Sequence, residues 1–456
     1  MAEIRFHDSA VNNIKALALK TEQSSAIAPE LYGRYEVKRG LRDNVTGKGV
    51  LAGLTDIGNV HSYIIQDEEM VPVPGKLFYR GYDMNAIVDG FLSEDRYGFE
   101  ETTYLLLFGD LPNKEELADF EDLLAKNRGL PEDFVRDIIM KAPSHDMMNA
   151  IARSILTLYS FDPTPDDTSV ENVLRQSIQL IANFPLLVVY SYMTYKHYFN
   201  GESLVIHTPR PDYSTAQNIM HLLKADYPLF EMESKLLDLA LVLHAEHGGG
   251  NNSTFVTHVV TSTGTDTYSA IAASLGSLKG PLHGGANLKV MQMFEDIKAN
   301  VKDWDNEDEI LEYLIKMLKK EVFDRKGLIY GIGHAVYTIS DPRTEVLKQQ
   351  SLKLADLKGM GDEMRLYLNV EKIAPRAVEA HRNVTKTVSA NVDFYSGLVY
   401  TMLDIPPELF TPIFAASRIS GWSAHRLEEI VNRGKIIRPA YKAISKRKDY
   451  VSLAGR

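Results

Sequence analysis

The stretch Gly280-Pro281-Leu282-His283-Gly284-Gly285-Ala286-Asn287 separates two helical patterns and therefore indicates a helical fold class. Apolar residues return every three or four positions over 268–278, and the same period resumes over 290–294. The glycines and the proline break the pattern between them, which places His283 beside the start of the second helix. The positive end of that helix dipole favours a neutral imidazole and stabilises negative charge on a nearby oxygen. A glycine-rich connection with an incidental histidine is the alternative.

Helical periodicity dominates the remaining chain as well. Apolar residues recur with the helical period over 99–107 and 115–124, and residues 109–112 interrupt them with Gly, Asp and Pro. The only convincing alternation of apolar and polar residues lies near the front, over 61–65 and 76–79. The predicted fold class is therefore mainly α, with a small N-terminal β-hairpin.

Length and composition limit the classes of protein. A chain of 456 residues is too long for one small core, so we expect at least two domains. The net charge of -11 argues against a nucleic-acid or anionic-membrane partner, and any anionic substrate then requires a local cluster of arginines. The absence of cysteine excludes a disulfide framework, a thiolate metal site and a cysteine nucleophile.

Two segments bear on the location of the protein. Residues 1–13 contain acidic side chains and no apolar core, so they do not resemble a signal or transit peptide. The longest apolar run, 180–195, contains Asn183 and Pro185 and is too short to span a bilayer. It predicts a buried helix. We expect a soluble, cytoplasmic protein without a membrane partner.

Another helical pattern begins at Ser234 and leads to His244 and His247, which three glycines follow. The pattern predicts that both histidines lie on one face at the helix end. Histidines three apart can hold a metal, and Glu246 between them suggests a hydrolase. The arrangement is not His-Glu-x-x-His, however, and no third ligand is evident. We predict no metal, with histidines that cap a core helix as the alternative.

A glycine-punctuated loop over 327–337 contains His334, and Arg343 follows nine residues later. Glycines let a backbone approach a flat or phosphorylated ligand closely. A dinucleotide site is the alternative, but it needs G-x-G-x-x-G at the start of a helix within a strand-helix-strand unit, and none is visible.

A single carboxylate, Asp393, lies among apolar and aromatic residues over 390–397. Desolvation there would raise its basicity, although a helix-capping aspartate is the alternative. Arg418 and Arg438 follow in apolar settings, where arginines usually face a carboxylate or phosphate.

Together these segments resemble the citrate synthase family. The resembling stretches extend over most of the chain and comprise residues 75–82, 104–112, 244–254, 280–287, 333–343 and 391–397. The resemblance implies a two-domain helical fold, in which a small domain of residues 284–393 closes over the substrates. Residues 1–283 and 394–456 would form the large domain, and the active site would lie in the cleft at a homodimer interface.

The resemblance also implies a role for each candidate residue. Asp393 would remove a methyl proton from the acetyl thioester, His283 would hydrogen-bond the thioester oxygen, and His334 would polarise the oxaloacetate carbonyl. Oxaloacetate would be held by His247, Arg343, Arg418 and Arg438, the last from the neighbouring subunit. Coenzyme A would contact Gly331, Gly333, Ala335 and Lys386.

The implied activity is condensation of acetyl-CoA with oxaloacetate and hydrolysis of citryl-CoA, without a cofactor or a metal. Thr338 stands where many members carry a basic residue near the CoA phosphates. A 2-methylcitrate synthase acting on propionyl-CoA is the nearest alternative, because one methylene is worth only about 1–3 kcal/mol in discrimination. A non-catalytic CoA or dicarboxylate sensor is the alternative from another class.

Overall fold

The computed structural model describes residues 11–43, 47–66, 69–224, 229–334, 336–382 and 388–455. The chain divides into two compact units, Met1–Leu54 and Thr55–Arg456, and each is described by itself. The described part of the first unit contains α1 (Val11–Ser25), α2 (Pro29–Arg34) and the 3-10 helix η2 (Arg39–Leu41). Its described side chains are exposed or half-buried.

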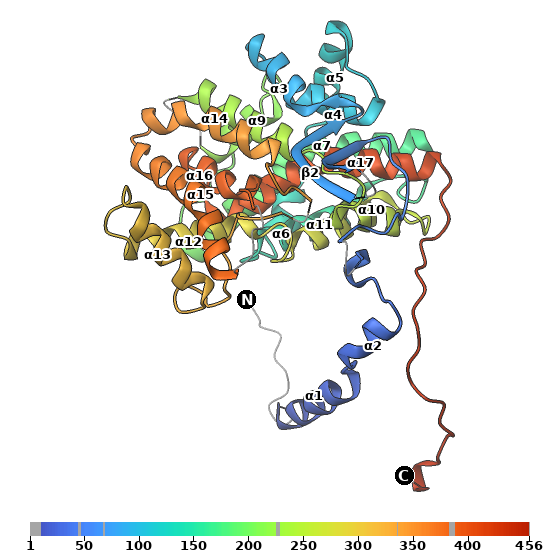
Figure 1. Cartoon of the computed structure of the whole chain (residues 1–456). Helices are drawn as coiled ribbons and strands as arrows, with labels where there is room; N and C mark the ends of the chain where they lie inside the picture. The colour runs from blue at the N-terminus through green and yellow to red at the C-terminus, as the bar shows by residue number, and fades with distance from the viewer. Residues whose placement is uncertain are drawn as a thin grey trace. The chain divides into compact units, whose positions relative to one another are not determined.

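The second unit is mainly helical, as predicted (Figure 1). Its α-helices are α3 (Met84–Ser93), α4 (Phe99–Phe108), α5 (Lys114–Lys126), α6 (Met147–Leu158), α7 (Val170–Asn200), α8 (Thr215–Leu223), α9 (Phe230–His244), α10 (Asn252–Thr261), α11 (Thr267–Lys279), α12 (Ala286–Asn300), α13 (Glu307–Leu318), α14 (Pro342–Leu357), α15 (Gly361–Arg382), α16 (Val392–Met402) and α17 (Phe410–Val431). Its short helices are η3 (Val135–Ile139), η4 (Tyr159–Phe161), η5 (Pro407–Leu409) and η6 (Leu453–Gly455).

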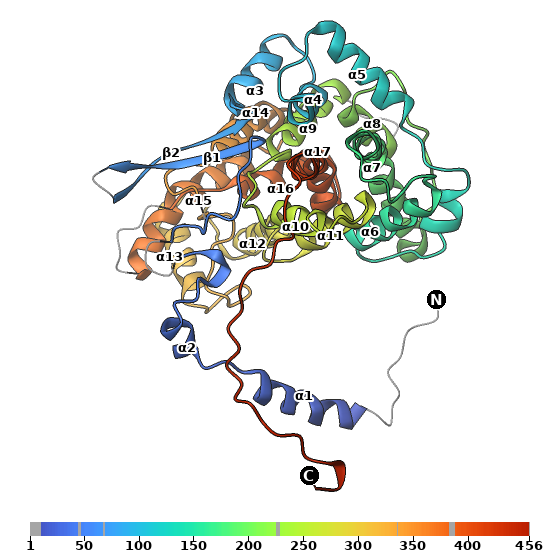
Figure 2. The same cartoon turned by 90° about the vertical axis from the view of Figure 1, so that its right-hand side faces the viewer.

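The predicted hairpin is present in this unit (Figure 2). Strands β1 (Gly58–Gln66) and β2 (Glu69–Tyr79) pair antiparallel, and a short third strand, β3 (Tyr82–Asp83), pairs with β2. Tyr79 at the end of β2 is fully buried, and its hydroxyl donates to the carbonyl of Val242 on α9 at 2.9 Å. The hairpin is therefore anchored to the helix that leads to His244.

Local signals placed several helix ends correctly. The two helices predicted over 99–107 and 115–124 are α4 and α5. Gly109 ends α4 in the left-handed conformation with φ of 97°, and Asn113 begins α5 with a capping box to Glu116. The turn around His283 joins α11 to α12, also as predicted.

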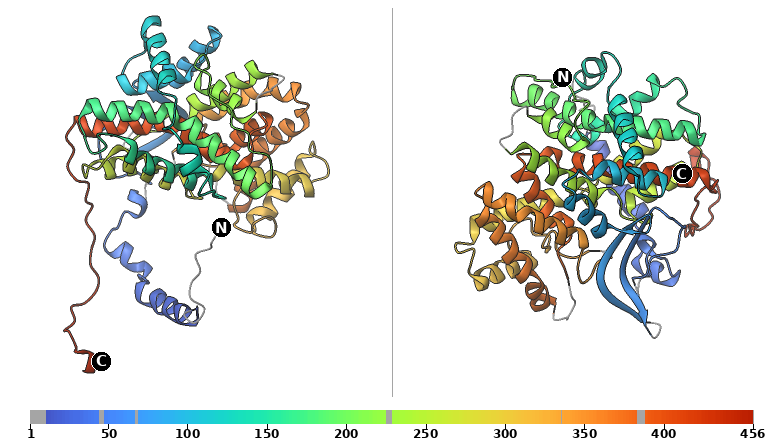
Figure 3. Two further views of the ribbon diagram at one scale, coloured as in Figure 1. Left: turned by 180° about the vertical axis from the view of Figure 1, so that it is seen from behind. Right: turned by 90° about the horizontal axis from the view of Figure 1, so that it is seen from above.

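Helix α17 lies in the core and is buried around most of its circumference. Every residue described as buried on it falls between Phe410 and Leu427, and it packs against α4, α7, α9, α10 and α11. In Figure 3, left, α7 in green lies along α17 in red. A helix that is apolar or buried on all sides belongs to the core of a large domain. Side chains on α17 are consequently held rigidly.

Helix α7 contains the apolar run 180–195. Among the described residues it is the one helix long and apolar enough to cross a membrane, and 83% of its most apolar window is buried inside the protein. The prediction of a buried helix for this run is confirmed. The argument that the segment is too short to span a bilayer was wrong, because the helix extends beyond the apolar run to 31 residues.

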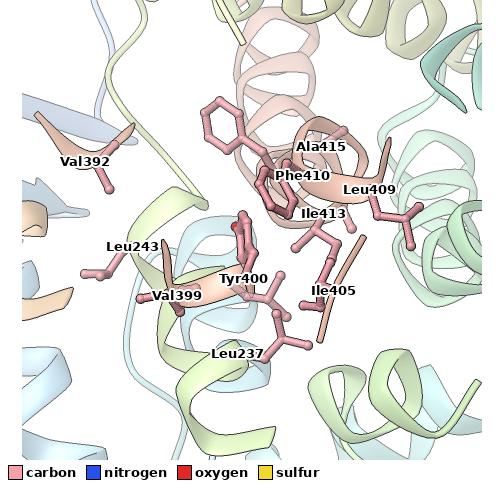
Figure 4. Close-up of a cluster of buried hydrophobic side chains, with 14 of the residues drawn as sticks. Leu237, Leu243, Val392, Val399, Tyr400, Ile405, Leu409, Phe410, Ile413 and Ala415 are labelled. Carbon is pink, nitrogen blue, oxygen red and sulfur yellow. The ribbon is translucent and has the colours of Figure 1, made fainter. Parts of the chain in front are cut away.

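An apolar cluster joins the segments that carry the candidate site residues (Figure 4). Leu243 comes from α9, Val399 and Tyr400 from α16, and Phe410 and Ile413 from α17. All five side chains are buried. The ends of α9 and α16 are thus fixed relative to α17 by close packing.

The predicted small domain, residues 284–393, contains α12 to α15 and the start of α16. Within it α13 packs on α15, and both α12 and α14 pack on α16. The two compact units do not divide the chain at residue 284 or 393. The domain boundaries stay a prediction.

Candidate active site

The prediction that His244 and His247 share one helical face is wrong, because α9 ends at His244. The ring of His244 is buried and its Nδ1 lies 2.7 Å from the carbonyl of Ala240, to which it donates. His247 lies beyond the helix end, just before Gly248, whose φ is +81°. The geometry therefore gives no support to a metal held by these two histidines.

The ring of His247 faces His334 and Tyr337. The ring centroids lie 5.3 Å apart for His247 and His334, and 5.6 Å apart for His247 and Tyr337. Nε2 of His247 is buried and has no hydrogen-bond partner among the described side chains and backbone. Burial, helped by the charge of Arg343, lowers the pKa of this imidazole well below its ordinary value, so the ring is neutral.

Backbone geometry determines the tautomer of His334. Its Nδ1 accepts from the backbone N–H of Val336 at 3.1 Å and from that of Tyr337 at 3.0 Å. A nitrogen that accepts two hydrogen bonds carries a lone pair, so the proton of the neutral ring is on Nε2. The ring also stacks on Tyr337 at a centroid distance of 4.9 Å. Nε2 is therefore the hydrogen-bond donor of this ring.

Asp393 lies in the first turn of α16, but it does not cap the helix. The N-cap is Asn391, whose Oδ1 accepts from the backbone N–H of Asp393 at 3.0 Å. Burial raises the pKa of the Asp393 carboxyl to about 6, against the lowering effects of Arg343 and Arg418. The raised basicity predicted from the apolar surroundings agrees with this result.

A backbone junction ties the Asp393 segment to the His334 loop. Asn391 donates from its backbone N–H to the carbonyl of Gly331 at 2.8 Å and from Nδ2 to the carbonyl of Gly333 at 2.8 Å. Gly333 in turn donates to the carbonyl of Ser389 at 2.7 Å. These bonds fix the start of α16 relative to the loop that carries His334.

The two glycines in this loop have backbone roles of their own. Gly331 and Gly333 have φ values of +79° and +93°, which L side chains rarely adopt. A Cβ on Gly331 would lie 2.9 to 3.0 Å from atoms of Phe394, whereas one on Gly333 would meet nothing within 4 Å. The predicted coenzyme A contacts of both glycines stay predictions. Ala335 and Lys386 lie outside the described residues.

Arg343 is buried and paired with Asp341. Its Nε and Nη2 donate to the two carboxylate oxygens of Asp341 at 3.0 and 2.7 Å. The same carboxylate caps α14 and accepts from the backbone N–H of Val392 at 3.3 Å. Asp341 thus fixes Arg343 beside the start of α16, and these bonds leave Nη1 of Arg343 for another partner.

Arg418 is fully buried on α17. Its Nε donates to the carbonyl of His244 at 2.6 Å, but Nη1 and Nη2 have no partner among the described residues. The guanidinium carbon lies 4.7 Å from the ring centre of Phe414. Burial lowers the pKa of Arg418 to about 10, which still leaves it charged at neutral pH. A buried cation with two unsatisfied nitrogens is costly unless an anion binds to it.

His283 lies in the turn between α11 and α12, three residues before Ala286. Its Nε2 lies 3.2 Å from Oγ of Ser253, which also accepts from Nε1 of Trp422 at 3.2 Å. Burial, with a smaller effect of Arg418, lowers the pKa of His283 to about 4, so the ring is neutral as predicted. No local pattern in the sequence indicates a role for Trp422, because its partner lies 169 residues away in the chain.

Among the residues predicted to hold oxaloacetate, Arg438 is the one that no described contact joins to the others. It is exposed on the segment after α17, and the neighbouring Ile437 donates from its backbone to Ser262 at 3.1 Å. Ser262 follows the last residue of α10, whereas Ser253, the partner of His283, lies in its first turn. The roles predicted for all these residues remain predictions.

Comparison of the sequence with known proteins indicates one family. The family model described as "Citrate synthase, C-terminal domain" matches residues 46–440. A citrate synthase of Deinococcus radiodurans is 37% identical over 330 residues, which cover 72% of this chain and 81% of the relative. A 2-methylcitrate synthase of Shewanella oneidensis is 33% identical over 374 residues, which cover 82% and 90% respectively.

Solved structures of citrate synthases have the same fold as this chain. The crystal structure of citrate synthase from Pyrobaculum aerophilum has a TM-score of 0.72 at 29% identity, over 92% of this chain and 95% of that chain. Citrate synthase from Thermoplasma acidophilum, in ternary complex with carboxymethyl coenzyme A and oxaloacetate, shares the fold with a TM-score of 0.74 at 23% identity, over 92% and 100%.

The fold and these similarities together define a condensing enzyme of the acyltransferase class. The chain belongs to the citrate synthase family. The predicted family and the predicted fold class are both confirmed.

Two buried arginines on α17 predict opposite effects on stability. Arg426, two turns after Arg418, donates to Thr261, Thr267 and the carbonyl of Thr265. We expect Arg426→Met to lower the free energy of unfolding by about 2–4 kcal/mol, because it leaves buried acceptors unpaired. Arg418→Met should leave stability unchanged or raise it by about 1–2 kcal/mol, because it removes a buried unpaired charge.

Urea denaturation of the two variants and the wild type, without added ligand, measures this difference. A loss of stability in Arg418→Met as large as that in Arg426→Met would mean that the guanidinium of Arg418 is satisfied within the protein.

Proposed function

We propose that this protein is a citrate synthase, which condenses acetyl-CoA with oxaloacetate and hydrolyses the citryl-CoA formed. The observation that carries the proposal is the buried guanidinium of Arg418 with two nitrogens that lack partners among the described residues. Burial has the largest effect on the pKa values of His247, His283 and Asp393, and the charge of Arg418 also shifts each of them. Arg418 therefore lies within electrostatic reach of all three. A carboxylate bound in this fork would lie beside the acid–base groups.

Asp393 is proposed as the base that removes a proton from the thioester methyl. This methyl is a very weak carbon acid, so the carboxylate needs a hydrogen-bond donor at the oxygen where charge develops. We assign that donor to His283. The indole N–H of Trp422 can only donate, so Oγ of Ser253 accepts from it. The single hydrogen of Ser253 can go to Oδ1 of Asn251 at 2.9 Å or to Nε2 of His283 at 3.2 Å, and for the reaction we assign it to His283. The ring proton of His283 is then on Nδ1.

His334 is proposed to act on oxaloacetate. With its proton on Nε2 it can polarise the ketone carbonyl and then protonate the alkoxide that forms on attack by the enol. His247, Arg418 and the free side of Arg343 would hold the two carboxylates. The Thermoplasma relative, whose structure contains oxaloacetate and a coenzyme A analogue, supports these two ligand classes.

The acyl group separates two candidate functions. Relatives at 37% and 33% identity are named citrate synthase and 2-methylcitrate synthase, respectively. Acetyl-CoA is our proposal, and propionyl-CoA with a 2-methylcitrate product is the second candidate. One methylene in an apolar pocket changes kcat/KM by roughly 10- to 200-fold, which a kinetic comparison resolves.

Steady-state kinetics with oxaloacetate test the proposal by following thiol release from acetyl-CoA and propionyl-CoA. We expect kcat/KM to be about tenfold or more higher for acetyl-CoA. Asp393→Asn serves as the control, because it keeps the shape of the side chain but cannot accept a proton, and it should bind oxaloacetate without releasing thiol. A preference for propionyl-CoA would identify the second candidate, and no release from either donor would refute both.

The pH dependence follows from the raised pKa of Asp393. The base must be ionised, so kcat/KM for acetyl-CoA at saturating oxaloacetate should fall below pH 6, by about tenfold per pH unit. This profile reports the enzyme–oxaloacetate complex, in which we expect the pKa of Asp393 to stay near the value of about 6 that burial gives it, so the midpoint of the acid limb should lie near pH 6. A midpoint near pH 4, the value of an ordinary carboxyl group, would contradict the assignment of a desolvated base.

We also propose a homodimer in which Arg438 completes the site of the other subunit, which the exposure of Arg438 supports. Asp393→Ala and Arg438→Ala, each inactive alone, should then recover roughly a quarter of wild-type activity after refolding together. Half of the dimers are mixed, and each mixed dimer has one intact site. Asp393→Ala refolded with Arg418→Ala should show no recovery, because both residues come from one chain. A similar absence of recovery in the first pair would refute the shared site.

A further inference from the structure

Four titratable side chains that the proposed reaction does not use form a continuous series of contacts, which begins at Glu246, the residue before His247. Oε1 of Glu246 is 3.0 Å from Nε2 of His425, and Nδ1 of His425 is 3.1 Å from Nε2 of His258. Nδ1 of His258 is 2.9 Å from Oε2 of Glu429. Glu246 and His425 are fully buried. We refer to His425 and His258 as the histidine pair.

Hydrogen-bond chemistry fixes the protons on the outer sides of the histidine pair. An ionised carboxylate only accepts, so Nε2 of His425 and Nδ1 of His258 both carry protons. The inner nitrogens face each other at 3.1 Å, where two lone pairs would repel. One further proton between them removes this repulsion and makes the pair a single cation, which the buried carboxylate of Glu246 balances.

The surrounding charges favour this state. Burial alone would lower the pKa of His425, but Glu246 and Glu428 raise it to about 9. Oε2 of Glu428 lies 3.7 Å from Nδ1 of His425, and the hydroxyl of Thr55 lies 3.5 Å from the same nitrogen. Burial raises the pKa of Glu246, but His425 and then Arg418 bring it below the ordinary value. The ion pair is therefore present at neutral pH.

Glu246 connects the pair to the backbone on both sides of His247. Its carboxylate accepts from the backbone N–H of Gly248, so the side chain of one residue bonds to the residue two positions later. The backbone carbonyl of Glu246 lies 3.3 Å from the hydroxyl of Tyr79, whose hydrogen it shares with the carbonyl of Val242. These bonds hold the backbone groups immediately before and after His247 and so restrict its backbone dihedral angles.

The space around the Glu246 carboxylate is also closed. A Cβ on Gly58 would lie 2.7 Å from Oε1 of Glu246, and one on Gly421 would lie 2.5 Å from Oε2. Because the two glycines leave no space beside the carboxylate for another side chain, the carboxylate depends on His425 for a hydrogen-bonded counter-charge.

We infer that His425 is a positioning residue for oxaloacetate binding: as part of the protonated histidine pair it holds the Glu246 carboxylate, which orients His247. The inference rests on the proposed function in that His247 contacts oxaloacetate. His425 itself touches no substrate in this arrangement, and loss of its charge acts through Glu246.

Substitution separates this role from general damage to the fold. His425→Leu should raise KM for oxaloacetate on the order of 10- to 100-fold, because a small misplacement of a binding group has effects of this size. KM for acetyl-CoA and kcat should change by less than about threefold. His425→Gln, which keeps an N–H for Glu246, should recover part of the loss. His197→Gln, a histidine change in the last turn of α7, is the matched control and should leave all constants unchanged.

The wild type gives a second readout that does not depend on the folding of a variant. A raised histidine pKa means that the ion pair is intact at neutral pH and is lost as pH rises through about 9. KM for oxaloacetate should therefore rise between pH 8 and 10 in the wild type. In His425→Gln this rise should be absent. This rise in KM at alkaline pH is well separated in pH from the acid limb of kcat/KM that we assign to Asp393.

Three outcomes would overturn the inference. They are an unchanged oxaloacetate KM in folded His425→Leu, an equal increase in KM for both substrates, and stabilisation of the wild type but not of His258→Gln by one equivalent of Zn²⁺. The last would show that a metal occupies the group His258, His425 and Glu428, whose donor atoms lie within 4.8 Å of one another. If the wild type released no thiol, the proposed function would fail separately. Calorimetric oxaloacetate affinity of the wild type and His425→Leu would then decide the inference.

Discussion

The charge of Arg418, buried on the central helix, is the constraint on which the rest of the site depends. Its guanidinium has one internal hydrogen bond, to the carbonyl of His244, and two nitrogens without partners among the described residues. Such a charge is tolerated only where packing holds the helix and where nearby groups adapt to it. The neighbouring imidazoles of His247 and His283 are neutral, chiefly because they are buried, so they add no further positive charge beside Arg418. The same charge limits how far burial raises the pKa of Asp393.

The acid–base groups are placed by a few short polar junctions at helix starts. Asn391 caps α16 and holds the His334 loop through the carbonyls of Gly331 and Gly333. Asp341 caps α14, pairs with Arg343 and accepts from the start of α16. Each junction satisfies backbone groups that a helix end leaves unpaired, so the stabilisation of the fold and the placement of the site come from the same bonds.

Two groups of charged side chains lie near His247, and they differ in character. The neutral imidazoles and the buried guanidinium groups of the proposed substrate site suit an anionic ligand. The ionised carboxylate of the preceding residue, Glu246, is instead balanced by the histidine pair. Of the positive groups that lower the pKa of this carboxylate, His425 has the largest effect and Arg418 follows it.

The sequence by itself determined the helical class, the hairpin, the turn that carries His283 and the apolar setting of Asp393, because each follows from the periodicity or composition of a short segment. It also predicted that the helix before His247 continues, which was wrong because α9 ends at His244. Only the tertiary structure paired Arg343 with Asp341 and left the Nη groups of Arg418 without partners. It alone joined Glu246 to His425, which lies 179 positions later, and Ser253 to Trp422. Contacts between residues so far apart leave no periodic signal along the chain, since they depend on how helices pack around α17.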